Sequence, residues 1–339
     1  SAAPRIRRTL PKLYRKLTMY FDSSLGRLRL PVIGSPLFLV SGPDLVIAQC
    51  KAGVIGSFPA LNARENDGDP PLLEAWLKRI TEELDAHNQA NPDRPAAPFA
   101  VNQIVHRSND RVERDIEICA RWKVPVWITS MGAREDVNQA AHDCGGIVLH
   151  DVINNRFAKK AIDKGADGLI AVCAGAGGHA GALSPFALVQ EIREWFDGPL
   201  ALSGSISTGS SVLAAQAMGA DFAYIGSPFI ATNEAVATDV YKQMIVDGGA
   251  EDILYTSHFS GVNANYLKPS VRATGLDPDN LTGEGNKLNL ATGDIRPKAW
   301  RDIWGSGQGI GAVSAVTPTA DYIDRLDREY HAAKDAFCA

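Results

Sequence analysis

The sequence lacks any arrangement of cysteine or histidine that would hold a metal ion or a set of disulfides. Its five cysteines are scattered through 339 residues and form no CxxC pair. An odd, scattered set excludes a disulfide framework and indicates a reducing compartment, so we expect a cytoplasmic protein. There is no HExxH segment, and no paired spacing relates His106, His142, His150 and His258. No metal site is therefore predicted.

Long apolar runs and clustered basic charge are also missing. No stretch approaches the roughly 20 apolar residues that a membrane span needs. The formal net charge is -5 and the basic residues are dispersed, which argues against a general nucleic-acid binder. The start of the chain differs, because six of the first sixteen residues are Lys or Arg. We expect residues 1–27 to form a basic extension that docks on the domain, with a targeting or membrane-surface helix as the alternative.

What the sequence does contain is a repeated alternation of short apolar runs and longer amphipathic segments. Each run is almost continuously apolar, as in parallel strands that are covered on both faces. Eight such units predict an α/β fold of the (β/α)8 TIM-barrel type. An open doubly wound sheet is the alternative, although it usually has fewer repeats. The eight runs are residues 30–36, 52–58, 97–103, 124–130, 145–151, 167–173, 199–205 and 221–227.

The alternation stops after the eighth run. Residues 232–297 are polar and rich in Gly, Pro and Asn. A segment of this length at that point predicts a lid or small second domain, inserted over the barrel mouth. The barrel itself is expected to comprise residues 28–231 and 298–339, and to end in a terminal helix.

One glycine-rich segment, VCAGAGGHAG at residues 172–181, surrounds a single histidine, His179. Glycine lets the backbone bend sharply or approach a ligand closely. The segment follows the sixth strand, and barrel active sites lie at the C-terminal ends of the strands. Histidine can accept or donate a proton near neutral pH. We therefore predict that His179 is catalytic and points into the mouth; a loop histidine bonded to nearby backbone is the alternative.

The ends of the seventh and eighth strands have the features of a phosphate site. Phosphate commonly binds a TIM barrel after these two strands. Gly204 and Gly226 can present N–H groups there, and Ser205 and Ser227 add hydroxyl groups. Either loop alone could be a tight turn, but the two together predict a phosphorylated cofactor.

The helices expected after these strands have recognisable starts. Ser207 or Thr208 can cap the first helix, and Pro228 suits the first turn of the second. Two helix N-termini that face one point form an anion site. The chain has no Walker A sequence, and GSGQGIG at 305–311 fails the dinucleotide spacing because position 310 is Ile. FMN fits best, with pyridoxal phosphate or a sugar phosphate as alternatives.

Three segments, AGGHAG, SGSI and YIGSPFIATNEA, resemble the nitronate monooxygenase family, formerly called 2-nitropropane dioxygenases. The likeness extends over nearly the whole chain after the basic leader. It implies an FMN-binding barrel in which His179 occupies the position of the family's catalytic base. The cofactor contacts implied by the resemblance or by the loop chemistry above are Asn102, Gly177, Gly178, Gly204, Ser205, Tyr224, Ile225, Gly226, Ser227 and Gln308.

The chain departs from the family pattern at four positions. The family often has glutamine where Val172 and Tyr224 stand, and glutamate where Gly175 stands. Threonine is common where Ser227 stands, and serine keeps the hydroxyl. The loss of polar groups at positions 172 and 175 removes possible contacts near the flavin, so the resemblance carries over less well to the substrate than to the cofactor.

The resemblance implies an FMN-dependent oxidoreductase that converts alkyl nitronates with O2 to carbonyl compounds and nitrite. Nitroalkanes would first lose a proton to His179. The first alternative is an NAD(P)H-dependent reductase that passes hydride through FMN to a quinone or an enoyl thioester. The second is a binding module without turnover. We expect small-molecule substrates, no nucleic-acid partner, and a monomer or homodimer.

Overall fold

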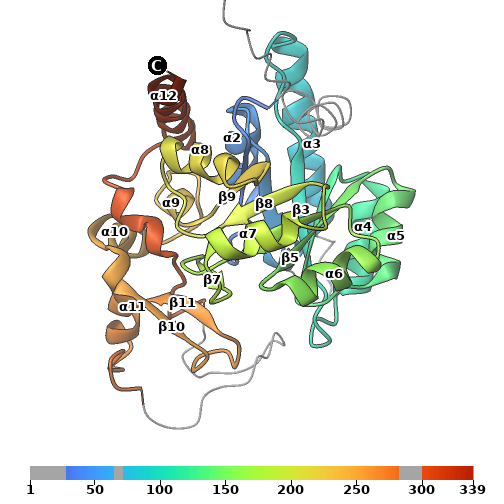
Figure 1. The fold of residues 1–339 in the computed structure, drawn as a ribbon. Coiled ribbons are helices and arrows are strands. Elements are labelled where there is room, and N and C mark those ends of the chain that lie inside the picture. Colours follow the sequence, from blue (N-terminus) through green and yellow to red (C-terminus); the bar gives the residue numbers. More distant parts are fainter. Residues whose placement is uncertain (1–27, 65–71, 282–299, 339) are drawn as a thin grey trace, which may run out of the picture.

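The computed structural model describes residues 28–64, 72–281 and 300–338. At its centre lies a sheet of eight parallel strands, with helices around it (Figure 1). Each strand overlaps one of the eight predicted apolar runs, so the predicted strand positions are confirmed. The strands are β1 (Val32–Gly34), β2 (Gly56–Pro59), β3 (Phe99–Ile104), β4 (Val126–Ser130), β5 (Ile147–Val152), β6 (Gly168–Val172), β8 (Leu200–Ser203) and β9 (Phe222–Ile225).

The sheet closes into a barrel. Its strand order is β1-β9-β8-β6-β5-β4-β3-β2. The first and last strands of this order meet through a parallel bridge between Ile33 and Ile55. Gly34 N donates to Ile55 O at 2.7 Å and Ile55 N donates to Val32 O at 3.1 Å. The predicted TIM barrel is therefore confirmed, and the open doubly wound sheet is excluded.

Side chains of each strand point alternately into the barrel and towards the helices. Ile128, Leu149 and Ile170 belong to the cluster inside the barrel. Val148 and Leu169, the neighbours of two of them, belong to the larger cluster between the sheet and the helices. Because both faces are buried, neither can be polar over most of its length, which explains the almost continuously apolar runs.

Helices cover the outside of the barrel (Figure 1). Within the described residues, no helix is both long and apolar enough to cross a membrane. The predicted C-terminal helix, α12 (Thr319–Cys338), packs on α8 (Gly209–Ala217), where Tyr330 Oη donates to Gln216 Oε1 at 2.6 Å. The remaining helices around the barrel are α2 (Pro43–Lys51), η1 (Ala60–Asn62), α3 (Leu72–Ala90), α4 (Val112–Arg121), α5 (Glu135–Asp143), α6 (Asn155–Asp163), α7 (Pro185–Arg193) and α9 (Ser227–Ile230).

The segment after β9 forms a small antiparallel sheet with its own helices. β10 (Ile253–Thr256) pairs with β11 (Ala264–Leu267), and β11 pairs in turn with the two-residue strand β7 (Gly178–His179). The segment expected to be a lid is therefore joined by hydrogen bonds to the glycine–histidine loop (Figure 1). Its helices are α10 (Asp239–Asp247), η2 (Ala250–Asp252) and α11 (Lys268–Ala273).

Two of the predicted parts fall partly or wholly outside the described residues. The basic extension at residues 1–27 lies outside them, as does the end of the predicted lid, residues 282–297. The division of the chain into a barrel and a substrate domain stays a prediction.

Candidate active site

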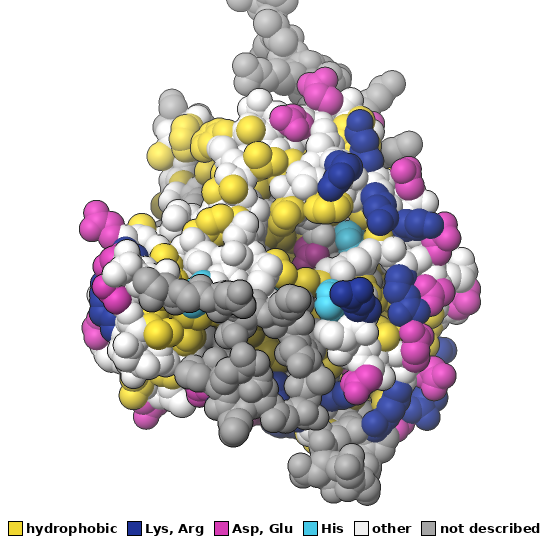
Figure 2. All heavy atoms as spheres, turned by 90° about the horizontal axis from the view of Figure 1, so that it is seen from below, with side chains coloured by type: hydrophobic (Ala, Val, Ile, Leu, Met, Phe, Trp, Pro, Cys, Tyr) yellow, Lys and Arg dark blue, Asp and Glu magenta, His cyan; other side chains and the backbone are white. Residues whose placement is uncertain are grey.

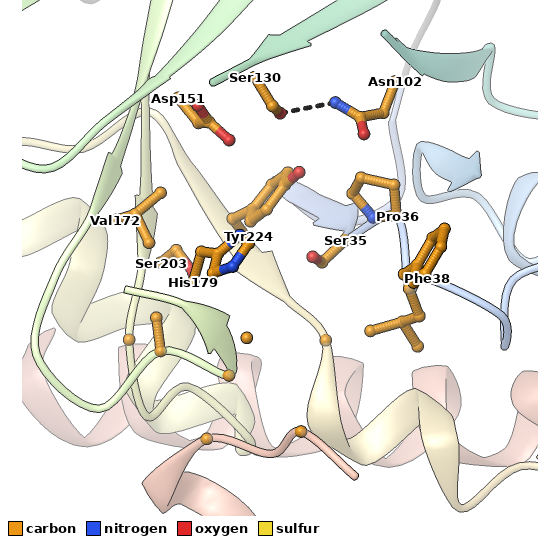
Figure 3. A pocket seen from close by; sticks show the side chains of 18 of the residues that line it. Ser35, Pro36, Phe38, Asn102, Ser130, Asp151, Val172, His179, Ser203 and Tyr224 are labelled. Carbon is orange, nitrogen blue, oxygen red and sulfur yellow. Dashed lines mark hydrogen bonds between the residues drawn. The ribbon is translucent and has the colours of Figure 1, made fainter. Parts of the chain in front are cut away.

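A cavity of about 520 Å³ opens at the C-terminal ends of the barrel strands. Figure 2 looks onto this end of the molecule, where a hollow carries histidine and acidic side chains and Lys and Arg side chains gather along one side. Inward-pointing residues near the C-terminal ends of several strands form its floor (Figure 3). These floor residues are Asn102, Ser130, Asp151, Val172, Ser203 and Tyr224.

The glycine–histidine loop forms one wall of the cavity and is fixed by segments far away in the sequence. Asn265 Nδ2 donates to Ala176 O at 2.7 Å. Gln308 N, at the start of the 3-10 helix η3 (Gln308–Ala312), donates to Gly175 O at 2.9 Å. A Cβ atom on Gly177 would lie 2.8 Å from Gly307 N. At this position glycine is therefore required by the close approach of the chain's own backbone.

His179 lies in β7, the strand of the small sheet that borders the barrel mouth. Its ring packs edge-on against Trp300, with ring centroids 5.3 Å apart, and lines the cavity. Burial, with a smaller contribution from nearby His106, lowers the pKa of His179 to about 4. The imidazole is therefore neutral at pH 7 and has a lone pair that can accept a proton.

The hydrogen bonds around Ser260 determine which nitrogen of His179 holds the proton. His179 Nε2 lies 3.4 Å from Ser260 Oγ. That hydroxyl donates to Val262 O at 3.0 Å and accepts from Tyr266 Oη at 3.1 Å. Because a hydroxyl has only one proton to donate, Ser260 must accept from His179. The neutral ring then carries its proton on Nε2, and Nδ1 holds the free lone pair.

The strand ends predicted to bind phosphate meet at one side of the cavity. Thr208 is the N-cap of α8, and its side chain accepts a hydrogen bond from Ser211 N. Of the two alternatives predicted for this cap, Ser207 and Thr208, the structure has Thr208. Gly204 and Ser205 have φ angles of 144° and 56° and lead the backbone into this helix. Ser207 Oγ is buried and has no hydrogen-bond partner among the described residues.

These features fit a bound phosphate. A buried hydroxyl without a partner is costly unless a ligand or water satisfies it. Ser207 lines the cavity beside a helix N-terminus, where free N–H groups and the helix dipole favour an anion. Pro228 lies in the first turn of α9, as expected. Glycine positions at 175 and 177 leave the opposite wall without side chains, which suits a flat ring system.

Most of the predicted cofactor residues come together. All except two of them line the cavity. Ile225 is buried in the layer between the sheet and the helices, so only its backbone could reach a ligand. Gln308 lies behind Gly175 and supports the loop through its backbone. Those that line the cavity are Asn102, Gly177, Gly178, Gly204, Ser205, Tyr224, Gly226 and Ser227, together with His179.

The sequence reasoning missed a carboxyl group on the cavity floor. Asp151 ends the inward face of β5, and burial raises its pKa to about 6 although Ser130 and the N–H of Met131 oppose the shift. Burial, together with the negative charge of Asp151, raises the pKa of Tyr224, so the phenol stays protonated. A polar pair, His150 and Asp151, at the end of the apolar run 145–151 was the available signal, because polar residues at the ends of barrel strands belong to active sites.

Comparison with known proteins identifies the family to which the chain is similar. A family model described as nitronate monooxygenase matches residues 23–329. A nitronate monooxygenase from Paraburkholderia phytofirmans is 24% identical over 88% of this chain and 92% of its own length. A (3aS,4S,5R,7aS)-5-hydroxy-7a-methyl-1-oxo-octahydro-1H-indene-4-carboxyl-CoA dehydrogenase from Rhodococcus jostii is 24% identical over 68% of this chain and 61% of its own.

A solved structure resembles the whole chain. The nitroalkane oxidase from Streptomyces ansochromogenes matches with a TM-score of 0.72 and 20% sequence identity, over 94% of this chain and 99% of that one. At this level of identity the likeness concerns the fold.

Proposed function

The chain belongs to the nitronate monooxygenase family, a family of flavin-dependent oxidoreductases, and from this premise we propose that it binds FMN and oxidises alkyl nitronates with O2 to carbonyl compounds and nitrite. Nitroalkanes are substrates of the same site once they have lost a proton. The observation that carries the proposal is His179, a neutral imidazole with a free Nδ1 in a glycine-lined barrel mouth.

The cofactor would be held by two groups of cavity residues, one for its phosphate and one for its ring system. Gly204, Ser205 and Ser207 would bind the phosphate at the start of α8. Asn102 and Tyr224, on the floor, and Gly177, on the wall, would contact the ring. When bound, FMN supplies the electron transfer to and from substrate and oxygen, and the protein supplies orientation and proton chemistry.

For a neutral nitroalkane, the base would be Nδ1 of His179. It takes the proton from the carbon that bears the nitro group, and Ser260 holds the Nε2–H so that the correct nitrogen faces the substrate. The low pKa keeps the ring unprotonated throughout the neutral range. Trp300 packs against the ring and limits its rotation. A nitronate, which is already an anion, needs none of these steps.

A second candidate is favoured by relatives that are named as carboxyl-CoA dehydrogenases, among them the one from Rhodococcus jostii. Such an activity would use the same cavity for hydride transfer between a thioester substrate or NAD(P)H and FMN. The flavin spectrum separates the two candidates. We expect anaerobic addition of propyl nitronate to bleach the bound flavin and NADH or NADPH to leave it oxidised; rapid bleaching by NADH or NADPH alone would instead establish the reductase.

The role of His179 is tested by His179→Asn. We expect the variant to retain FMN and nitronate oxidation, while nitroalkane turnover falls by about 10²-fold or more, the contribution of a positioned base. His258→Asn, a histidine in the β10–β11 connection, is the matched control and should behave like the wild type. Equal turnover of neutral nitroalkane by His179→Asn and the wild type would show that His179 is not the base.

A further inference from the structure

The carboxyl group of Asp151 has no role in the chemistry proposed so far. It is the last inward-pointing side chain of β5 and lines the cavity floor opposite the loop that carries His179 (Figure 3). In the described part of the chain, no Lys or Arg forms an ion pair with it. A carboxyl group in such a place costs free energy when ionised, so a purely structural role is a poor explanation.

The backbone next to Asp151 is shaped to face it. Met131, directly after β4, has a φ angle of 64°, which a side chain of this size rarely adopts, and Gly132 follows with a φ angle of 158°. This turn brings the N–H of Met131 to the Asp151 carboxyl group, and Ser130 adds its hydroxyl. Backbone strain of this kind is concentrated at functional sites. Ser130 also accepts from Asn102 Nδ2 at 2.7 Å, so the carboxyl group is tied to a predicted flavin contact.

The other titratable groups at the cavity do not neutralise Asp151. Tyr224 of β9 faces it from across the floor as a protonated phenol. His179 of β7 is neutral, and it lies beside His106, which follows β3. Lys160 of α6 lines the outer part of the cavity and is exposed. His150, next to Asp151 on β5, also belongs to the cavity lining; burial lowers its pKa to about 4, so it is uncharged at neutral pH, and its Nδ1 lies 2.6 Å from Thr129 Oγ1.

We propose that Asp151 takes up a proton when the flavin in this cavity is reduced, and so sets the reduction potential of the cofactor. This inference rests on the proposed binding of FMN. A reduced flavin that gains two electrons and one proton carries one more negative charge than the oxidised form. A carboxylate on the cavity floor disfavours that charge through Coulomb repulsion. Uptake of a second proton from water by the Asp151 carboxylate leaves the net charge of the site unchanged.

The electrons come from the reductant, which is the nitronate or a hydride donor in turnover and dithionite in the test below. Above the pKa of Asp151, which is about 6 in the protein without ligand, the carboxylate lowers the potential. At lower pH the group is already protonated and the effect disappears. Asp151→Asn has the shape of the protonated acid and no charge, so at no pH should position 151 lower the potential of this variant.

The experiment measures the midpoint potential of the FMN-loaded protein against a reference dye between pH 5.5 and 8.5. At pH 8 we expect Asp151→Asn to favour reduction at least tenfold, which is about 30 mV for a two-electron couple. The difference should vanish near pH 5.5, and the wild-type potential should fall more steeply with pH than that of the variant. Asp163→Asn, an exposed aspartate at the end of α6, is the matched control and should follow the wild type.

Ser130→Ala provides a second variant that keeps the carboxyl group. It removes a hydroxyl that lowers the pKa of Asp151, so the bend in its potential–pH curve should move to higher pH. Parallel curves for the wild type, Asp151→Asn and Ser130→Ala would overturn the role of Asp151 while leaving FMN binding intact. A protein that takes up no FMN in a fluorescence titration would overturn the proposed function, and this inference with it.

Discussion

At the scale of single residues, the chemistry depends on which nitrogen of His179 is free. Ser260 is buried, and its one proton goes to the carbonyl of Val262. The tautomer of His179 is thus controlled from β11 and the loop before it, about 80 residues away along the chain. Tyr266, fully buried in β11, completes the arrangement by donating to the same hydroxyl. A base held in this way has one orientation in which Nδ1 is free to accept a proton.

This arrangement predicts the effect of Ser260→Ala. Without the hydroxyl, His179 Nε2 loses its acceptor, and both tautomers and ring orientations become accessible. We expect nitroalkane kcat to fall roughly tenfold, part of the about 10²–10⁴ that a positioned base contributes. Nitronate turnover should stay unchanged, because that substrate is already deprotonated. Steady-state kinetics with both substrates make the comparison.

The control for Ser260→Ala is Ser270→Ala. Ser270 is also buried and lies in α11, directly after β11, but its hydroxyl bonds Leu267 and Trp304 instead of the histidine. Loss of both activities in both variants would indicate a structural effect of Ser260 and contradict its control of the tautomer.

At the scale of elements, the cavity is built where segments from distant parts of the chain meet. The glycine–histidine loop touches β11 on one side and residues 305–308 on the other. Gly307 N also donates to Ser227 Oγ at 2.8 Å, which connects the C-terminal segment to the start of α9. The loop therefore depends on contacts that a shift of the C-terminal segment would break.

Gly307→Ala tests this dependence. A Cβ atom at this position would lie 2.6 Å from Gly175 O and 2.8 Å from Gly177 N, and neither backbone atom can move without moving the loop. We expect FMN affinity to fall at least tenfold, and the overpacking to cost about 1–3 kcal/mol of stability. Fluorescence titration with FMN and thermal unfolding measure the two effects.

A neighbouring glycine offers the control for that substitution. Gly249 has an ordinary extended conformation with a φ angle of -134° and open space around its Cβ position. Gly249→Ala should leave both FMN affinity and thermal stability near the wild-type values. Wild-type FMN affinity in Gly307→Ala would show that the loop does not need the C-terminal segment for binding.

The barrel could be predicted from the sequence because its signals are local. A run such as 124–130 is almost continuously apolar, and burial of both faces of a parallel strand requires this. The N-cap Thr208 and the first-turn proline Pro228 are local signals too, and the structure contains both. His179 was found because its four neighbouring glycines are unusual in sequence.

The rest of the site depends on contacts between distant segments. Ser260 and Trp300 reach His179 only after β11 pairs with β7, and nothing in their own neighbourhoods predicts that pairing. The polar end of the run 145–151 was a local signal for Asp151, but its interactions come from other strands. Ser130 of β4 opposes the rise in its pKa, and its charge raises the pKa of Tyr224 of β9. The small sheet formed by β10, β11 and β7 was not predicted, because β7 has two residues and a glycine-rich sequence.

At the scale of the whole molecule, three titratable groups at the mouth end of the barrel, one buried and two partly buried, make stability depend on pH. Burial lowers the pKa of both His150 and His179 from 6.5 to about 4. Between pH 6.5 and 4 the unfolded chain therefore binds more protons at these positions than the folded protein, and stability falls as the pH falls. Asp151 contributes in the opposite direction, because its pKa is raised from 3.8 to about 6. Between these pH values the folded state binds the additional proton, so the contribution of Asp151 to stability rises as the pH falls.

The net effect of these three groups is a loss of stability in acid, and His150 offers the clearest test of it. This side chain is 5% exposed, and its Nδ1 lies 2.6 Å from Thr129 Oγ1. It belongs to the cavity lining, but no step of the proposed chemistry uses it. A shift from 6.5 to about 4 corresponds to a loss of about 3 kcal/mol between pH 7 and pH 4. The glutamine in His150→Gln cannot titrate and keeps an amide near Thr129. Between pH 7 and pH 4, the free energy of unfolding in urea should therefore fall by about 3 kcal/mol less in the variant than in the wild type. Equal pH dependence in the wild type and the variant would mean that His150 is protonated in the folded protein as readily as in the unfolded chain, which the burial of its side chain should prevent.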